Sequence, residues 1–211
     1  TRVAGNGFEE NDEVGVFALV GSSTMKEERY ADNLRFFRTS EKVFESSEPI
    51  YYPDDEVTLR LISYYPYQEE GVNMGESTMS VAVETDQNLS AGYFCSDFLV
   101  ASQNLQSAPK GAIALHYDHK FFKLKIALVG KEGEELQGIL DADPKLSVCG
   151  FYTKAIYDFQ KETYSAFSNE KSITPAGKWE IQGDRLSGKE VILIPQETTL
   201  GYQYIVLDVG G

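Results

Sequence analysis

The sequence predicts an all-β protein, and three observations support this fold class. Apolar and polar side chains alternate in several short segments, which is the period of a strand with one buried face. The aromatic residues are 13 Tyr and 12 Phe against a single Trp, and Tyr and Phe suit a pleated, half-buried surface. No segment longer than about ten residues keeps the helical period of apolar positions, so the strand interpretation is favoured.

Composition narrows the class of protein further. The chain of 211 residues is 42% hydrophobic, which is too apolar for a disordered chain. Its formal net charge of −14 would repel nucleic-acid phosphates and anionic lipid headgroups, so no nucleic-acid partner is expected. The sequence contains no apolar run of about 18 residues, the length that a membrane-spanning helix needs.

The first predicted strand is Glu13–Val20 (EVGVFALV), which is apolar on both faces and therefore fits a central, fully covered strand. The polar stretch Gly21–Asn33 is expected to be a surface loop. Further strands are predicted where alternation or β-forming residues recur, with proline ending the second of them. They are Leu34–Arg38, Pro49–Pro53, Val57–Tyr65 and Thr78–Val83.

The stretch Ser96–Gly130 contains two alternating runs. In the first run, Leu115, Tyr117 and His119 fall on one face of a predicted strand. In the second run, four apolar residues point one way while two lysines point the other, as in a half-buried antiparallel strand. The apolar residues are Phe122, Leu124, Ile126 and Leu128, and the lysines are Lys123 and Lys125.

A domain boundary is predicted at residues 140–147, which divides the chain into domains 1–145 and 146–211. The charged turn before it and the sequence DADPK mark the break. Beyond it the predicted strands are Leu146–Tyr152, Lys178–Ile181, Glu190–Ile194 and Tyr202–Val209, with a tight turn at Asp184–Lys189. The second domain has only about 65 residues, which is small for a sandwich with its own core.

Reactive groups give little support for catalysis or metal binding, so no catalytic residue, no metal ligand and no cofactor is predicted. His116 and His119 are the only histidines, and on a strand they face opposite sides. A satisfied core or interface histidine is the favoured interpretation of His119. The acidic groups Asp54–Glu56 and Asp141/Asp143 lack the ligand spacing of a calcium loop and fit solvated turns.

Two other features each allow two interpretations. Cys95 and Cys149 lie in apolar contexts, so two buried free thiols are favoured over a disulfide between them. The cluster Tyr64-Tyr65-Pro66-Tyr67 could be a platform on which sugars stack. The favoured alternative is a strand end whose rings pack on the core.

Several segments together resemble the fimbrillin family of Bacteroidetes, the subunits of type V pili. ENDEVGVFA at Glu10–Ala18 resembles the family's leading strand, although Asn11 stands where the family has glycine. IYYP at Ile50–Pro53 and YYPY at Tyr64–Tyr67 resemble its aromatic pair. Further matches in the same order are SDFLVA at Ser96–Ala101, IALHYDHKFFK at Ile113–Lys123 and ILIPQ at Ile192–Gln196.

The resemblance implies two transthyretin-like β-sandwich domains, the second one short or incomplete, because the family usually continues with another hairpin after Tyr202–Val209. It also implies an exported lipoprotein at the outer membrane or in the fimbria. The expected role is non-enzymatic: a structural or adhesive pilus subunit, with other subunits as partners and host or bacterial surface glycans or proteins as further candidates. A carbohydrate-binding surface lipoprotein is the alternative.

The resemblance further implies assembly by β-strand donation. In polymerising members an arginine-specific protease trims the N-terminal segment, which carries a possible cleavage site to Arg2 in this sequence. The strand-exchange region would include Val14, Val16 and Ala18 near the N-terminus and Tyr204 and Val206 near the C-terminus. Residues 146–211 are expected to need a strand from elsewhere, since a sheet lacking a strand exposes unpaired backbone groups.

Overall fold

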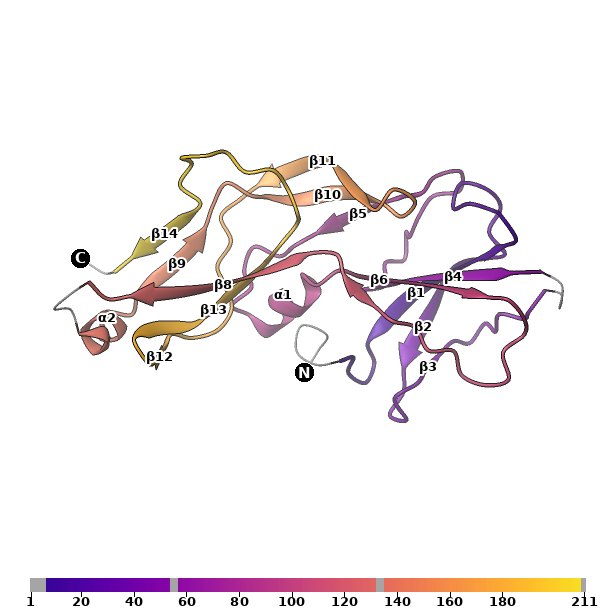
Figure 1. Ribbon diagram of the computed structural model, residues 1–211, viewed down its shortest axis with the longest axis horizontal. Helices are drawn as coiled ribbons and strands as arrows, with labels where there is room; N and C mark the ends of the chain where they lie inside the picture. The colour runs from indigo at the N-terminus through magenta and orange to yellow at the C-terminus, as the bar shows by residue number, and fades with distance from the viewer. Residues whose placement is uncertain (1–6, 54–56, 132–134, 210–211) are drawn as a thin grey trace. The chain divides into compact units, whose positions relative to one another are not determined.

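The computed structural model describes residues 7–53, 57–131 and 135–209 (Figure 1). These residues form fourteen strands and two short helices, α1 (Ser90–Cys95) and α2 (Leu136–Asp141). The all-β prediction is confirmed. Within the described residues, neither helix has the length or the apolar character needed to cross a bilayer.

The chain forms two compact units, and each unit draws on three stretches of sequence. The first contains the described residues of Thr1–Val81, Asp97–Lys120 and Ile156–Ser165, and the second contains those of Ala82–Ser96, Phe121–Ala155 and Ala166–Gly211. These units do not follow the predicted boundary at residues 145/146. The division into independently folding domains 1–145 and 146–211 stays a prediction.

The first unit is built on a six-stranded sheet in the order β3-β2-β1-β4-β6-β7, in which every neighbouring pair is antiparallel. Two of its edge strands have only two residues each. The strands are β1 (Glu13–Val20), β2 (Ala31–Arg38), β3 (Phe44–Glu45), β4 (Leu59–Tyr65), β6 (Leu99–Leu105) and β7 (Asp118–His119).

β1 is a central strand of this sheet, as predicted from its sequence. It pairs with β2 on one side and β4 on the other, and its six inner residues are all buried. Gly15 is required at its position, because a Cβ there would lie 2.2 Å from a ring carbon of Tyr64. Residues covered on both faces of a sheet must be apolar or very small, which is why EVGVFALV carries no charge after Glu13.

Three further sheets complete the fold. One has the order β11-β10-β5, with β5 (Thr78–Ala82), β10 (Tyr152–Asp158) and β11 (Thr163–Glu170). The second unit holds an antiparallel sheet in the order β12-β13-β8 and an antiparallel pair of β14 with β9. Their strands are β8 (Phe122–Val129), β9 (Lys145–Val148), β12 (Glu180–Gln182), β13 (Arg185–Leu193) and β14 (Ile205–Asp208).

In the second unit the side chain of Gln87 forms hydrogen bonds with β13 like those that a residue of a neighbouring strand would form. Its amide nitrogen donates to the carbonyl of Ile192 at 2.8 Å, and its amide oxygen accepts from the Ile192 N–H at 2.8 Å. Gln87 is completely buried. Its carboxamide therefore satisfies both backbone groups of one residue of β13.

Several sequence expectations are wrong in detail. Pro49–Pro53 is not a strand, and the predicted turn Asp184–Lys189 lies largely in β13. The hairpin turn comes earlier, where Gly183 takes a positive φ of 66°. The two short helices were not expected. Cys95 and Cys149 are free thiols as favoured, but Cys95 is exposed and Cys149 is only partly buried.

Candidate functional site

The six-stranded sheet of the first unit has two different faces, because alternate residues of β1 point to opposite sides. We call the side that carries Val14, Val16 and Ala18 the groove face, and the side that carries Phe17 and Leu19 the core face. The strand pairing shows which residues of the neighbouring strands lie on the groove face. Val14 pairs with Phe36 of β2, and Ala18 pairs with Leu61 of β4.

The core face is closely packed with aromatic rings. Phe17 stacks on Tyr64 with 5.8 Å between ring centroids, and Phe159 meets the two rings edge-on at 6.1 and 5.9 Å. Phe17 and Tyr64 are completely buried. These buried, mutually packed rings make this side of the sheet part of the hydrophobic core.

The groove face is covered by segments that are mostly not strands. Residues 46–52, which follow β3, lie over one part, and residues 109–117, which we call the strap, lie over another. Between these covers and the sheet is an apolar cavity of about 520 Å³. Its lining from the sheet comprises Val14, Val16, Phe36, Phe44, Leu59, Leu61 and Leu105, and its lining from the covers includes Pro49, Ile50, Tyr52, Pro109, Ala112, Ile113, Leu115 and Tyr117.

Phe8 also lines this cavity. Its ring centroid lies 5.0 Å from that of Phe44, 5.5 Å from Tyr65 and 5.0 Å from Tyr117, each with edge-to-face geometry. Such aromatic pairs stabilise a cluster beyond the area they bury. Phe8 therefore holds the beginning of the described chain against the groove face.

Tyr117 fixes the strap to the sheet by a polar contact under the apolar cover. Its hydroxyl oxygen lies 2.6 Å from that of Ser63, which is completely buried and also donates to the carbonyl of Gly15 at 3.0 Å. Burial raises the pKa of Tyr117 to about 12. The phenol is therefore neutral at physiological pH and acts as a hydrogen-bonding anchor.

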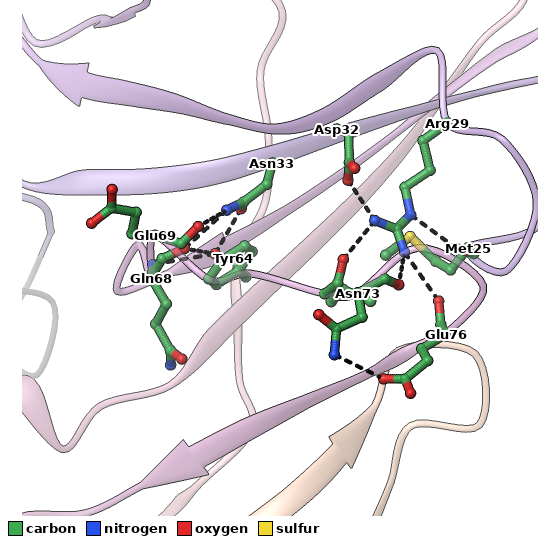
Figure 2. Close-up of polar contacts among 10 residues, drawn as sticks. Met25, Arg29, Asp32, Asn33, Tyr64, Gln68, Glu69, Asn73 and Glu76 are labelled. Carbon is green, nitrogen blue, oxygen red and sulfur yellow. Dashed lines mark hydrogen bonds and ion pairs between the residues drawn. The ribbon is translucent and has the colours of Figure 1, made fainter.

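A buried arginine organises the turn that follows β4 (Figure 2). The five N–H groups of Arg29 all donate: Nε to the carbonyl of Met25 at 2.9 Å, Nη1 to Val72 at 2.7 Å and to the carboxylate of Asp32 at 2.5 Å, and Nη2 to Asn73 at 2.7 Å and Glu76 at 3.1 Å. The Arg29 side chain is 0% exposed. Its guanidinium also lies 5.3 Å from the ring centroid of Phe17.

A second hub beside it is the hydroxyl of Tyr64 (Figure 2). It lies 2.8 Å from Oδ1 of Asn33 and 3.0 Å from the carbonyl of Gln68, and it accepts from the Gln68 N–H at 3.2 Å. Burial raises the pKa of Tyr64 to about 12. Together with Arg29, this hub holds the segment after β4 in place, with Arg29 and Asn33 contributing contacts from far away in sequence.

The residues predicted for strand exchange lie in both units. Val14 and Val16 line the cavity, and Ala18 belongs to the adjoining cluster with Leu59 and Leu61. Val206 lies in β14 and is 40% exposed, while Tyr204 precedes that strand and is partly buried. Arg2 and the acidic group Asp54–Glu56 lie outside the described residues.

His119 forms a polar contact with a buried carboxylate. His119 Nδ1 lies 2.9 Å from Oδ1 of Asp97, whose side chain is only 4% exposed. His119 is thus satisfied, as favoured, although its ring is 54% exposed and not in the core. Among the described residues, no group of three or more His, Cys, Asp or Glu side chains is arranged to hold a metal ion.

The cluster Tyr64–Tyr67 packs mainly inward. Tyr64 and Tyr65 are buried, which confirms the favoured interpretation that these rings pack on the core. Tyr67 is half-buried and has the guanidinium of Arg35 at 5.9 Å from its ring centroid. Two of the three rings are therefore inaccessible for stacking on a sugar.

Sequence reasoning missed the strap and the arginine network. Leu115 and Tyr117 have strand spacing and were expected to lie with His119 on one face of a strand, but regular pairing begins only at β7. The spacing did signal that these side chains share one side. Arg29 lies in a stretch that was expected to be a surface loop, and a single arginine among polar residues carries no burial signal.

The fold and this site define an antiparallel all-β protein whose main feature is an apolar groove. Among the described residues that line the groove, we find no arrangement of reactive side chains. A family model described as fimbrillin-like matches residues 1–211. The chain belongs to this fimbrillin-like family, and the resemblance found in the sequence is confirmed.

Solved structures share the fold at low sequence identity. Three Bacteroides proteins, each described as a "putative cell adhesion protein", match with the following values. The protein of Bacteroides uniformis has a TM-score of 0.64 and 20% identity over 95% of this chain and 73% of its own. The protein of Bacteroides ovatus has a TM-score of 0.64 and 15% identity over 94% of this chain and 73% of its own. The protein of Bacteroides thetaiotaomicron has a TM-score of 0.53 and 12% identity over 96% of this chain and 70% of its own. A comparison with curated proteins finds no match.

Proposed function

We propose that this chain is a non-enzymatic structural or adhesive subunit of a cell-surface pilus, which associates with other subunits by β-strand donation. Membership of the fimbrillin-like family supports the role, and the single observation that carries the mechanism is the apolar groove over the six-stranded sheet. The subunit would act outside the cell, at the outer membrane or in the fimbria, as an exported lipoprotein.

The groove face has the properties of a strand acceptor. Val14, Val16 and Leu61 form an apolar floor, and the covers above it leave a cavity of about 520 Å³. A donated strand would fill this space with its alternate side chains, and its backbone would pair with a free edge. Burial of apolar area supplies the driving force, at about 25 cal/mol per Å² removed from water.

β14 has the properties of a strand donor. Ile205, Val206 and Leu207 are 43%, 40% and 36% exposed, so both faces of this strand carry accessible apolar side chains. In the part of the chain that the structure describes, β14 pairs only with β9. An apolar strand with one free edge is a template for pairing with another chain.

Phe8 controls access to one part of the groove. Cleavage after Arg2 would leave Phe8 on the chain, so the ring would still have to leave the cluster with Phe44, Tyr65 and Tyr117. Processing at Arg2 therefore acts by freeing the segment that carries Phe8 and not by deleting it. The alternative role, carbohydrate binding through Tyr64–Tyr67, is less favoured because Tyr64 and Tyr65 are buried.

The proposal predicts that Val206→Asp abolishes assembly. The purified chain, treated briefly with an arginine-specific protease, should form oligomers or filaments that electron microscopy and light scattering detect. A carboxylate at position 206 would have to be buried in the acceptor groove, which is strongly unfavourable. The variant should therefore remain monomeric under the same treatment.

The matched control is Val129→Asp, which changes a valine of β8 that is 67% exposed in the same unit. It should assemble like the unchanged chain. Equal loss of assembly in both variants, or no assembly of the unchanged chain under any treatment, would argue against strand donation through β14.

A further inference from the structure

The strap leaves the six-stranded sheet and returns to it. Regular pairing in β6 ends at Leu105, and the chain rejoins the sheet at β7, where His119 pairs with Leu99 at the opposite end of β6. Residues 106–117 therefore run back along the length of β6 (Figure 1). Because the strap residues line the cavity, this return path lies over the groove face.

The strap places its side chains as a strand would. Ile113, Leu115 and Tyr117 line the cavity, with Leu115 and Tyr117 partly buried and Ile113 37% exposed, while Ala114 and His116 between them are exposed and do not line it. This period of two is the pattern by which an incoming strand would fill the same cavity. The strap therefore occupies positions that a donated strand needs.

Side chains alone hold the strap. Among the described residues, no backbone–backbone hydrogen bond joins residues 106–117 to another segment. The contacts of this segment include the apolar packing of its cavity-lining residues, the edge-to-face contact of Tyr117 with Phe8, the hydroxyl pair of Tyr117 with Ser63, and a 3.4 Å hydrogen bond from the Thr58 hydroxyl to Oε1 of Gln106. A Cβ added at Gly111 would meet no atom within 4 Å, so a side chain there has open space.

A segment without ladder hydrogen bonds opens at a lower free energy than the strands beneath it. β1 as a whole is paired with β2 on one side and β4 on the other, so lifting it would break two sets of ladder bonds, whereas the strap breaks one hydroxyl pair and apolar contacts. Its two ends are anchored in the sheet at β6 and β7, so it can lift without unfolding the unit.

We propose that the strap is a displaceable, autoinhibitory cover of the groove face, whose opening lets an apolar strand enter. This inference rests on the proposed function, because it assigns the regulation of the same groove to a segment of the chain itself. The occupant of the open groove is the β14 segment of a second copy, residues 202–209 (YQYIVLDV).

The opening can be measured with a thiol placed under the cover. Val16→Cys, in a chain that also carries Cys95→Ser and Cys149→Ser, puts one thiol on the groove face, and its rate of labelling by a soluble disulfide reagent reports opening. Tyr117→Phe removes only the hydroxyl pair and should accelerate labelling roughly fivefold. Gly111→Ala reduces the freedom of the open strap and should slow labelling roughly two- to fivefold.

Two controls separate strap opening from general unfolding. Tyr51→Phe removes a hydroxyl from a residue that is 72% exposed and should leave the labelling rate unchanged. Val81→Cys places the thiol at a buried position of β5 in the same unit, and Tyr117→Phe should not accelerate its labelling. Equal acceleration at positions 16 and 81 would mean that the whole unit opens, and it would overturn the proposal.

A synthetic peptide of residues 202–209 tests the consequence for strand entry. Its association rate with the chain should rise with Tyr117→Phe and fall with Gly111→Ala by the same factors as the labelling rate. If neither variant changes the labelling rate at position 16, the proposal that the strap is a displaceable cover is wrong. If both variants change the labelling rate but the peptide binds none of the chains, the result supports the strap as a displaceable cover. It then contradicts the acceptor role in the proposed function.

Discussion

At the scale of single residues, Arg29 combines a full positive charge with complete burial. Such a charge is tolerated only when its hydrogen-bond donors are all satisfied, and here three backbone carbonyls from residues 72–76, one from Met25 and the carboxylate of Asp32 satisfy them. The Asp32 side chain is 40% exposed, so this ion pair is only partly buried. Arg29 thus ties two loops together mainly through backbone acceptors.

Arg29→Met should lower the free energy of unfolding by about 3 kcal/mol or more. The change leaves several inward-pointing carbonyls without donors, and each hydrogen bond to a charged group contributes about 1.5–3 kcal/mol. Urea denaturation monitored by tyrosine fluorescence measures the loss.

The matched control is Arg35→Met, which removes an exposed guanidinium paired with Glu13. An exposed pair of this kind contributes about 0–1 kcal/mol. Similar destabilisation by both changes would show that the Arg29 network does not hold the turn.

The sequence could not predict this network, because three of its five hydrogen bonds depend on acceptors more than forty residues away. The separation between Arg29 and its acceptors Val72, Asn73 and Glu76 is 43 to 47 residues. Met25, which is also completely buried, stands alone among polar residues and gives no apolar period. The stretch Gly21–Asn33 was therefore expected to be a simple surface loop.

At the scale of secondary-structure elements, the two-residue strand β7 depends on a side-chain pair. His119 contacts one oxygen of the buried carboxylate of Asp97, whose other oxygen Oδ2 is buried without a hydrogen-bond partner in the described part of the chain. Removal of the imidazole would leave that carboxylate with no partner at either oxygen. A buried, unsatisfied polar group is more costly than a missing contact.

His119→Ala should therefore destabilise the first unit by about 1–3 kcal/mol. Urea denaturation gives this value, and His116→Ala is the matched control because His116 is exposed and lies three residues earlier. The double variant Asp97→Asn/His119→Ala should recover part of the loss, since the buried group is then neutral. No difference between the two histidine variants would contradict a structural role for the pair.

Elements with a continuous or regular pattern were predictable, and elements held by distant partners were not. β1 follows from eight residues whose apolar side chains occupy both faces. In β8, Leu124, Ile126 and Leu128 turn inward as predicted, but Phe122 is 39% exposed. The strap carries strand spacing without strand pairing, because spacing places side chains but does not supply a neighbouring backbone.

At the scale of the whole molecule, buried phenols set the alkaline limit of stability. Burial raises the pKa values of Tyr64 and Tyr117 from 10.0 to about 12. Below pH 10 both groups are neutral in the folded and unfolded states, so their contribution is fully present. Between pH 10 and 12 the unfolded phenols ionise first, and stability falls by up to about 2–3 kcal/mol for each tyrosine.

The free energy of unfolding should accordingly decline between pH 10 and 12 in urea titrations. Tyr117→Phe should decline less over this range, because it lacks one of the buried phenols. An unchanged slope in this variant would mean that the Tyr117 hydroxyl does not remain protonated in the folded chain.

The arrangement around Arg29 has a practical consequence for such measurements. The oxygen atoms that surround its guanidinium form a receptor for that chemical group, and the chain normally supplies the occupant itself. In the Arg29→Met variant, free guanidinium ions from a denaturant could re-enter the vacated position and partly restore the turn. Guanidinium chloride would then act as ligand and denaturant at once, so it would understate the damage that urea reveals.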